Sequence, residues 1–214
     1  MNRQPYEFTK LIQCWKSLPR DPGKAPLKTT FSPVNVSSLM PFLFLIERVK
    51  KGDLVVRLLG SELEQTLGCA GGDHRVFDAM MRKDWAFYDR FVQNCSDYIC
   101  AGRLLRSVRM SDGLIKDVES LHVPLADKYG DVRFMLGVMT ARTNRDASSR
   151  KCLKATKSTI LNYQYVDIGC GLPPVEGIVK AAEKTTKSPA QAGTEKTARE
   201  PLLSSGEHAS TYVS

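Results

Sequence analysis

Apolar residues gather in two short runs in the first third of the chain. Residues 42–49 and 54–59 are rich in bulky and β-branched side chains, and the polar residues 50–53 (KKGD) separate them. Runs of this length around a polar break that contains glycine favour a β-hairpin. Gly60 ends the second run, and Ser61 is then well suited to cap a helix. The pattern therefore predicts a hairpin that leads directly into helical structure.

Apolar residues that recur at three- and four-residue spacing predict two amphipathic helices. The first covers residues 6–18, and residues 19–23, which contain two prolines and a glycine, stop it. The second covers residues 84–99, with Asp84 in the position of the N-cap. Residues 61–83 precede it and contain three glycines, a pattern that predicts short helices and loops.

Three further strands are predicted after the second helix. They cover residues 103–110, 115–125 and 132–140, and polar turn residues separate them. The order is then helix, two strands, helices and three strands. Strands at both ends with helices between them predict an α+β fold, a five-stranded antiparallel sheet with helices packed on one face.

The strands at residues 42–49 and 132–140 are apolar at both alternating sets of positions. A sheet with one face in water would instead alternate between apolar and polar residues. A second covering layer is therefore expected, and the helix at 6–18 is the candidate, either from the same chain or from a second subunit. In a homodimer the contact residues would be Phe8, Leu11, Ile12 and Trp15.

The pattern divides the chain into three parts. Residues 1–26 form an N-terminal helix and connector, residues 27–142 form the folded domain, and residues 143–214 form a basic linker and a largely disordered tail. Residues 180–214 contain too few apolar side chains to offset the entropy lost on ordering. Residues 159–179 are more apolar, and we interpret them as an extra strand, a docking motif or a disordered segment.

The formal net charge of +8 is partly local, since residues 142–157 carry six basic side chains against one acidic side chain. One interpretation is a solvated linker. The alternative is a regulator that binds nucleic acid through this stretch, although aromatic side chains do not alternate with these charges as in single-strand binding grooves. No apolar run reaches the roughly 18 residues of a membrane span, and no signal peptide is recognisable, which predicts a cytoplasmic protein. The six cysteines are then expected to be thiols, and without a CxxC pair no zinc site is predicted.

The order of elements matches the PAS fold, and the chain resembles the single-domain PAS proteins common in alphaproteobacteria, grouped as a fifth PAS family. The resemblance covers about residues 8–141. It departs from the family at residues 68–74 (GCAGGDH), where an Asp-x-Thr-Gly-like step is common. The matching segments are residues 11–18 (LIQCWKSL), 31–33 (FSP), 39–45 (LMPFLFL), 57–63 (RLLGSEL), 123–125 (VPL) and 136–138 (LGV).

The resemblance implies a sensory or adaptor protein in bacterial signalling. Its expected partners are a second copy of the chain, in a homodimer, and a signalling protein. We find no Ser/His/Asp set, phosphate-binding loop or paired acids, so no catalysis is expected. Small molecules bind PAS domains between the sheet and the helices, in sites with apolar walls and a few polar groups. For every residue proposed to contact such a ligand, the alternative interpretation is ordinary core packing. The candidate ligand residues are Phe44, Leu58, Phe77, Trp85, Tyr88, Phe91 and His122.

The sequence requires no cofactor, but it leaves haem or another small ligand open. His74 lies where haem-binding PAS proteins often supply an axial ligand, and the alternative is an exposed loop histidine. His122 is either a pH or ligand switch or a histidine satisfied within the sheet. A redox sensor at Cys95 or Cys100, near the end of the second helix, would need an exposed thiolate of low pKa. Cys95 falls on the apolar stripe of that helix and is interpreted first as a core residue.

Overall fold

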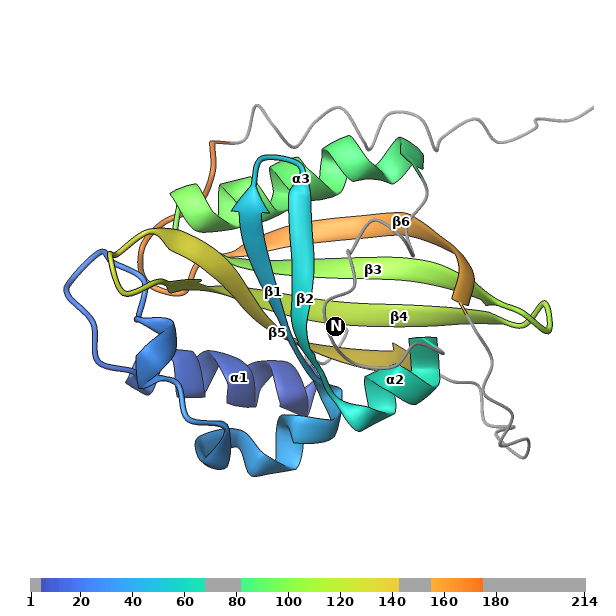
Figure 1. The fold of residues 1–214 in the computed structure, drawn as a ribbon, viewed down its shortest axis with the longest axis horizontal. Coiled ribbons are helices and arrows are strands. Elements are labelled where there is room, and N and C mark those ends of the chain that lie inside the picture. The colour runs from blue at the N-terminus through green and yellow to red at the C-terminus, as the bar shows by residue number, and fades with distance from the viewer. Residues whose placement is uncertain (1–4, 68–81, 143–154, 175–214) are drawn as a thin grey trace, which may run out of the picture. The chain divides into compact units, whose positions relative to one another are not determined.

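A computed structural model describes residues 5–67, 82–142 and 155–174 of the chain. Within these ranges, one six-stranded antiparallel sheet has the order β2-β1-β5-β4-β3-β6, with helices on both faces (Figure 1). The strands are β1 (Leu43–Lys50), β2 (Asp53–Leu59), β3 (Ala101–Met110), β4 (Ile115–Ala126), β5 (Val132–Arg142) and β6 (Ala155–Val166). The helices are α1 (Tyr6–Ser17), α2 (Ser61–Leu67) and α3 (Arg82–Asp97), with 3-10 segments at Lys28–Thr30 and Pro33–Phe42.

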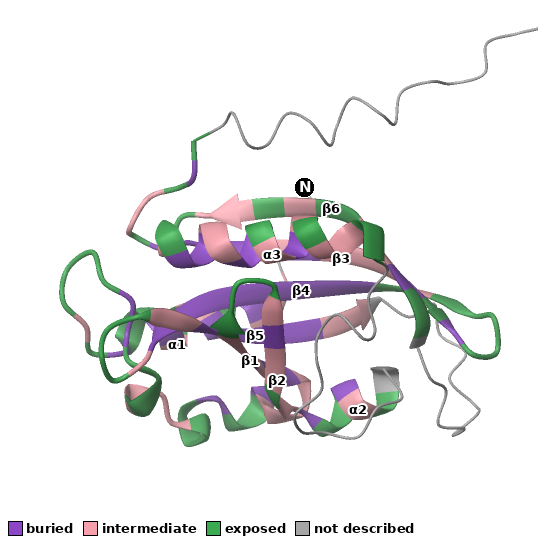
Figure 2. Ribbon diagram, turned by 45° about the horizontal axis from the view of Figure 1, so that its top comes forward, coloured by how far each residue is buried: buried purple, intermediate pink, exposed green. Residues whose placement is uncertain are grey.

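The predicted α+β architecture is confirmed, but the sheet has six strands where the sequence predicted five. The additional strand, β6, pairs with β3 from Ala101 opposite Val166 to Met110 opposite Ala155. Figure 2 shows β6 at the edge of the sheet with exposed and half-buried residues, whereas β4 is buried along most of its length. The sheet thus extends beyond residue 142, the domain end predicted from the sequence. The predicted disorder at 180–214 lies outside the described residues.

Helix α3 covers one face of the sheet, here called the α3 face. Its buried side chains pack on alternate residues of the strands, because successive strand residues point to opposite faces. Gly102 allows this close approach, since a Cβ atom there would lie 2.3 Å from Cζ of Phe91. The core of the α3 face includes Phe44, Ile46, Leu54, Tyr88, Phe91, Val92, Cys95, Leu104, Val108, Val118, Met135 and Met139.

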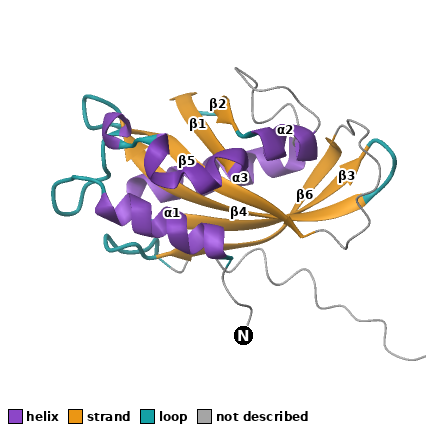
Figure 3. Ribbon diagram, turned by 90° about the horizontal axis from the view of Figure 1, so that it is seen from below, coloured by secondary structure: helices purple, strands orange, loops and turns teal. Residues whose placement is uncertain are grey.

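Helix α1 covers the opposite face, here called the α1 face, as the double-sided apolar strands predicted (Figure 3). Phe8, Leu11 and Trp15 are fully buried there against strand residues of the same chain. The Trp15 indole Nε1 donates a hydrogen bond of 2.6 Å to the carbonyl of Pro124 in β4. Proline has no N–H for sheet pairing and is rare in a central strand, and here the indole satisfies its carbonyl. None of the described helices is long and apolar enough to cross a membrane.

Candidate functional site

His122 lies near the centre of the α3 face, in a row that crosses three neighbouring strands. Gly137 of β5 and Gly102 of β3 are its register partners on either side. A Cβ atom at Gly137 would lie 2.0 Å from Cζ of Phe44, and one at Gly102 would meet Phe91 in the same way. The two glycines therefore make room for aromatic rings beside the imidazole, with centroid distances of 5.0 Å to Phe44 and 5.4 Å to Phe91.

The hydrogen bonds of His122 define its tautomer. Nδ1 lies 3.3 Å from the carbonyl oxygen of Gly102, which can only accept, so Nδ1 carries the proton. Nε2 lies 3.0 Å from the hydroxyl of Tyr88 on α3. Burial and the nearby positive charge of Arg106 lower the pKa of His122 to about 3, so the ring is neutral and Nε2 accepts a hydrogen bond from Tyr88. Burial also raises the pKa of Tyr88, which keeps the phenol protonated as a donor.

Protonation of His122 makes stability depend on pH in a defined window. The pKa is about 3 in the folded chain and ordinarily 6.5, so between these values the unfolded chain binds a proton that the folded chain does not. The free energy of unfolding therefore falls as the pH drops from 6.5 towards 3, by up to about 5 kcal/mol from this residue. Urea unfolding of wild type and His122→Gln at pH 7, 6, 5 and 4 measures this difference. Parallel pH dependences of the two proteins would contradict the assignment.

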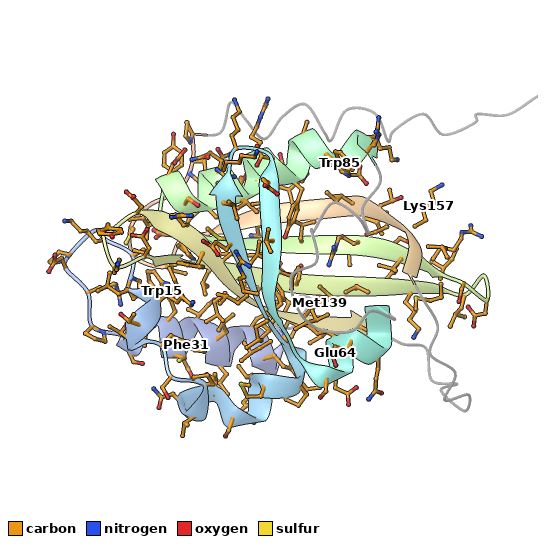
Figure 4. The ribbon with its side chains drawn as sticks, viewed as in Figure 1. Trp15, Phe31, Glu64, Trp85, Met139 and Lys157 are labelled. Carbon is orange, nitrogen blue, oxygen red and sulfur yellow. The ribbon has the colours of Figure 1, made fainter. Side chains whose placement is uncertain are left out.

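Among the described residues, the buried polar atoms of the α3 face without a hydrogen-bond partner include Nε of Arg106, Oγ of Ser120 and Oγ of Ser158. The three residues occupy the adjacent strands β3, β4 and β6, and each pairs in register with a residue of the apolar core or its edge. The Nη2 atom of Arg106 lies 3.6 Å from Sδ of Met139 on β5, and Met139 is labelled near the middle of the sheet in Figure 4. These polar groups were not among the candidates identified from the sequence.

The predicted ligand residues divide between the two faces. Phe44, Tyr88, Phe91 and His122 come together on the α3 face, and Trp85 packs at the edge of the same core. Leu58 instead lies on the α1 face.

The position of Leu58 follows from a bulge in β2. Phe44 pairs with Leu59 and Leu45 with Leu58, but Ile46 pairs with Val56, so Arg57 is the extra residue. An extra residue reverses the alternation of side chains between the faces. Leu59 therefore shares the face of Phe44, where the sequence had placed Leu58.

The remaining histidine and cysteine candidates give no further site within the described ranges. Phe77 and His74 lie outside them, so haem ligation by His74 stays an open alternative. Cys95 and Cys100 are both fully buried, and burial raises the pKa of Cys95, whereas a hydrogen bond with Cys95 lowers that of Cys100. No three His, Cys, Asp or Glu side chains of the described ranges are grouped as a metal site requires.

The predicted dimer contacts are largely occupied by the chain itself. Phe8, Leu11 and Trp15 are buried on the α1 face, and Ile12 is half-buried beside them. A dimer formed through these side chains would require α1 to leave its own sheet. Dimerisation stays a prediction, and so does nucleic-acid binding through residues 142–157, most of which lie outside the described ranges.

A PAS domain has an antiparallel sheet in the order 2-1-5-4-3, and its helices lie between the second and third strands along the chain. Residues 3–140 match the PAS_5 family, described as a PAS domain. The chain therefore belongs to the PAS_5 family, as the resemblance implied. No curated protein matches the chain.

Three solved structures are similar to part of the chain. A sensory box histidine kinase/response regulator from Burkholderia thailandensis E264 has 16% identity and a TM-score of 0.37, covering 52% of this chain and 84% of that one. An RNA-binding light-oxygen-voltage receptor has 18% identity and a TM-score of 0.36, covering 50% and 31% respectively. The VqmA dimer of Vibrio cholerae without target DNA has 11% identity and a TM-score of 0.36, covering 59% and 61%.

Proposed function

We propose that this PAS protein is a non-catalytic sensor or adaptor that binds a small molecule on the α3 face and signals through contact with a protein partner. The observation that carries the proposal is the gathering of unpartnered buried polar atoms on one face. Buried polar groups are normally hydrogen-bonded, and each exception needs an explanation. Of the five such atoms in the described residues, three belong to Arg106, Ser120 and Ser158, on the adjacent strands β3, β4 and β6 of the α3 face.

A small molecule explains these atoms better than core packing does. Packing alone favours apolar side chains at these positions, because an unpartnered buried hydroxyl costs about 1–3 kcal/mol. Ligand sites in proteins combine apolar and aromatic walls with a few such polar groups. Phe44 and Phe91 supply aromatic walls beside the hydrogen-bonded pair of Tyr88 and His122.

Native mass spectrometry of the gently purified chain tests the proposal. We expect a species heavier than the polypeptide, whose excess mass is lost on denaturation. Ser120→Val removes a polar group from the α3 face and should lower the fraction that carries the excess mass. Ser37→Val, at an exposed position, is the control and should behave as wild type. A wild-type spectrum that contains the polypeptide mass alone would contradict the proposal.

A further inference from the structure

Arg106 places a positive charge on the α3 face, and the described residues supply no acidic partner for it. Its register partners are Val118 on β4 and Ile160 on β6, both apolar. Among the described residues, none of the ion pairs includes Arg106. Its Nη2 atom contacts the thioether of Met139, which is a weak acceptor, and its Nε atom has no partner.

The described residues around Arg106 do not neutralise this charge. Burial lowers its pKa, but a guanidinium remains protonated in proteins. Tyr88 and His122, the titratable groups that interact with it, are both neutral at pH 7. Asp84 on α3 has a buried carboxylate oxygen, but that oxygen has no partner. Arg106 is half-buried, with its Nε atom buried, so part of this charge lies away from water without a counter-charge among the described residues.

The Arg106 side chain runs across the strand that carries one of the unpartnered hydroxyls. Arg106 starts on β3 and reaches Met139 on β5, so its side chain crosses the intervening strand β4. Ser120 of β4 pairs with Met139 and therefore lies along this path. Ser158 on β6 pairs with Val108 and shares the face of Arg106, but β6 lies on the side of β3 away from Met139. An anion at the guanidinium would thus lie beside the hydroxyl of Ser120.

We propose that the α3 face binds a small organic carboxylate, with its charged end on Arg106 and the Ser120 hydroxyl and its apolar body against the aromatic side chains. The inference rests on the proposed function and names its ligand class. The planar fork of a guanidinium matches the two oxygens of a carboxylate, and such charge-assisted hydrogen bonds are stronger than neutral ones. Phe44 and Phe91 favour a partly apolar molecule over a purely polar anion such as phosphate.

Thermal unfolding of the dialysed full chain with matched pairs of probes tests the inference. The probes are benzoate with benzamide and hexanoate with hexanamide, which differ in charge but little in shape. We expect at least one carboxylate to raise the melting temperature by about 5 °C at saturating concentration, well above its amide. Arg106→Met should weaken this binding by about 100-fold or more. Arg109→Met, at an exposed position on the same strand, should bind as wild type.

The outcomes separate this inference from the proposed function. If amide and carboxylate stabilise equally, or if Arg106→Met keeps the affinity for the carboxylate, the anion is not recognised, while a small-molecule sensor remains supported. If no probe stabilises the wild type, the carboxylate inference is overturned, and native mass spectrometry decides the proposed function separately. The comparison of carboxylate with amide on the wild type needs no variant, so it holds even if Arg106→Met fails to fold.

Discussion

Trp15→Ala is expected to lower the free energy of unfolding by about 3–5 kcal/mol, the usual loss for a fully buried tryptophan. Trp15 is 1% exposed and belongs to the core of the α1 face. The substitution also leaves the Pro124 carbonyl without the 2.6 Å hydrogen bond from the indole. Domains of this size are stable by only about 5–15 kcal/mol, so the variant loses a large part of its stability.

Urea unfolding followed by circular dichroism measures this loss. Lys16→Ala is the matched control, because Lys16 is the next residue of α1 and is exposed. We expect the control to lie within about 0.5 kcal/mol of wild type. A loss below about 1 kcal/mol for Trp15→Ala would mean that α1 does not pack on the sheet as described.

A chain that ends at Arg142 is expected to aggregate or to melt at least about 10 °C below the full chain, whereas one that ends at Pro174 keeps the full melting temperature. The shorter chain lacks β6. Tyr165 stacks on Phe91 at 5.5 Å and accepts a hydrogen bond of 3.0 Å from Asn94, and both contacts are lost. The backbone of β3 then forms an exposed edge, which is prone to pair with other chains.

Differential scanning calorimetry and light scattering of the two truncated chains measure this effect. The comparison matters because the family match ends at residue 140, so a chain cut at that boundary would lose a strand. Ile168 adds to the expected difference, since it is 1% exposed within the core of the α1 face. Equal melting temperatures for the two chains would show that β6 contributes little to the sheet.

The local spacing of apolar residues predicted much of the fold. The spacing of Phe8, Leu11 and Trp15 predicted α1 and its buried face, because a helix repeats every 3.6 residues. Two strands are apolar at both alternating sets of positions, and this pattern predicted that other elements would cover both faces of the sheet. The segment that became β6 was ambiguous, since its first residues lie in the basic stretch and its pairing partner β3 is about fifty residues away.

The candidate site was only partly predictable. Arg106 interrupts alternate apolar positions at Leu104, Val108 and Met110, which is the signal in the sequence that marks this position. The contact between Tyr88 and His122 joins residues 34 positions apart, which periodicity cannot predict. Leu58 was misplaced because the bulge at Arg57 appears only once the register of β1 and β2 is known.

The edge strand β6 connects the α3 face with the C-terminal part of the chain. Ser158 on β6 shares a face with Arg106, and the strand continues through Val166 towards the C-terminal residues. Ile160 of β6 pairs with Arg106, so an anion that holds Arg106 in place on β3 also favours the pairing of β6 with β3. Thermodynamic reciprocity then requires that a partner protein that separates β6 from β3 also lowers the affinity of the site for the anion.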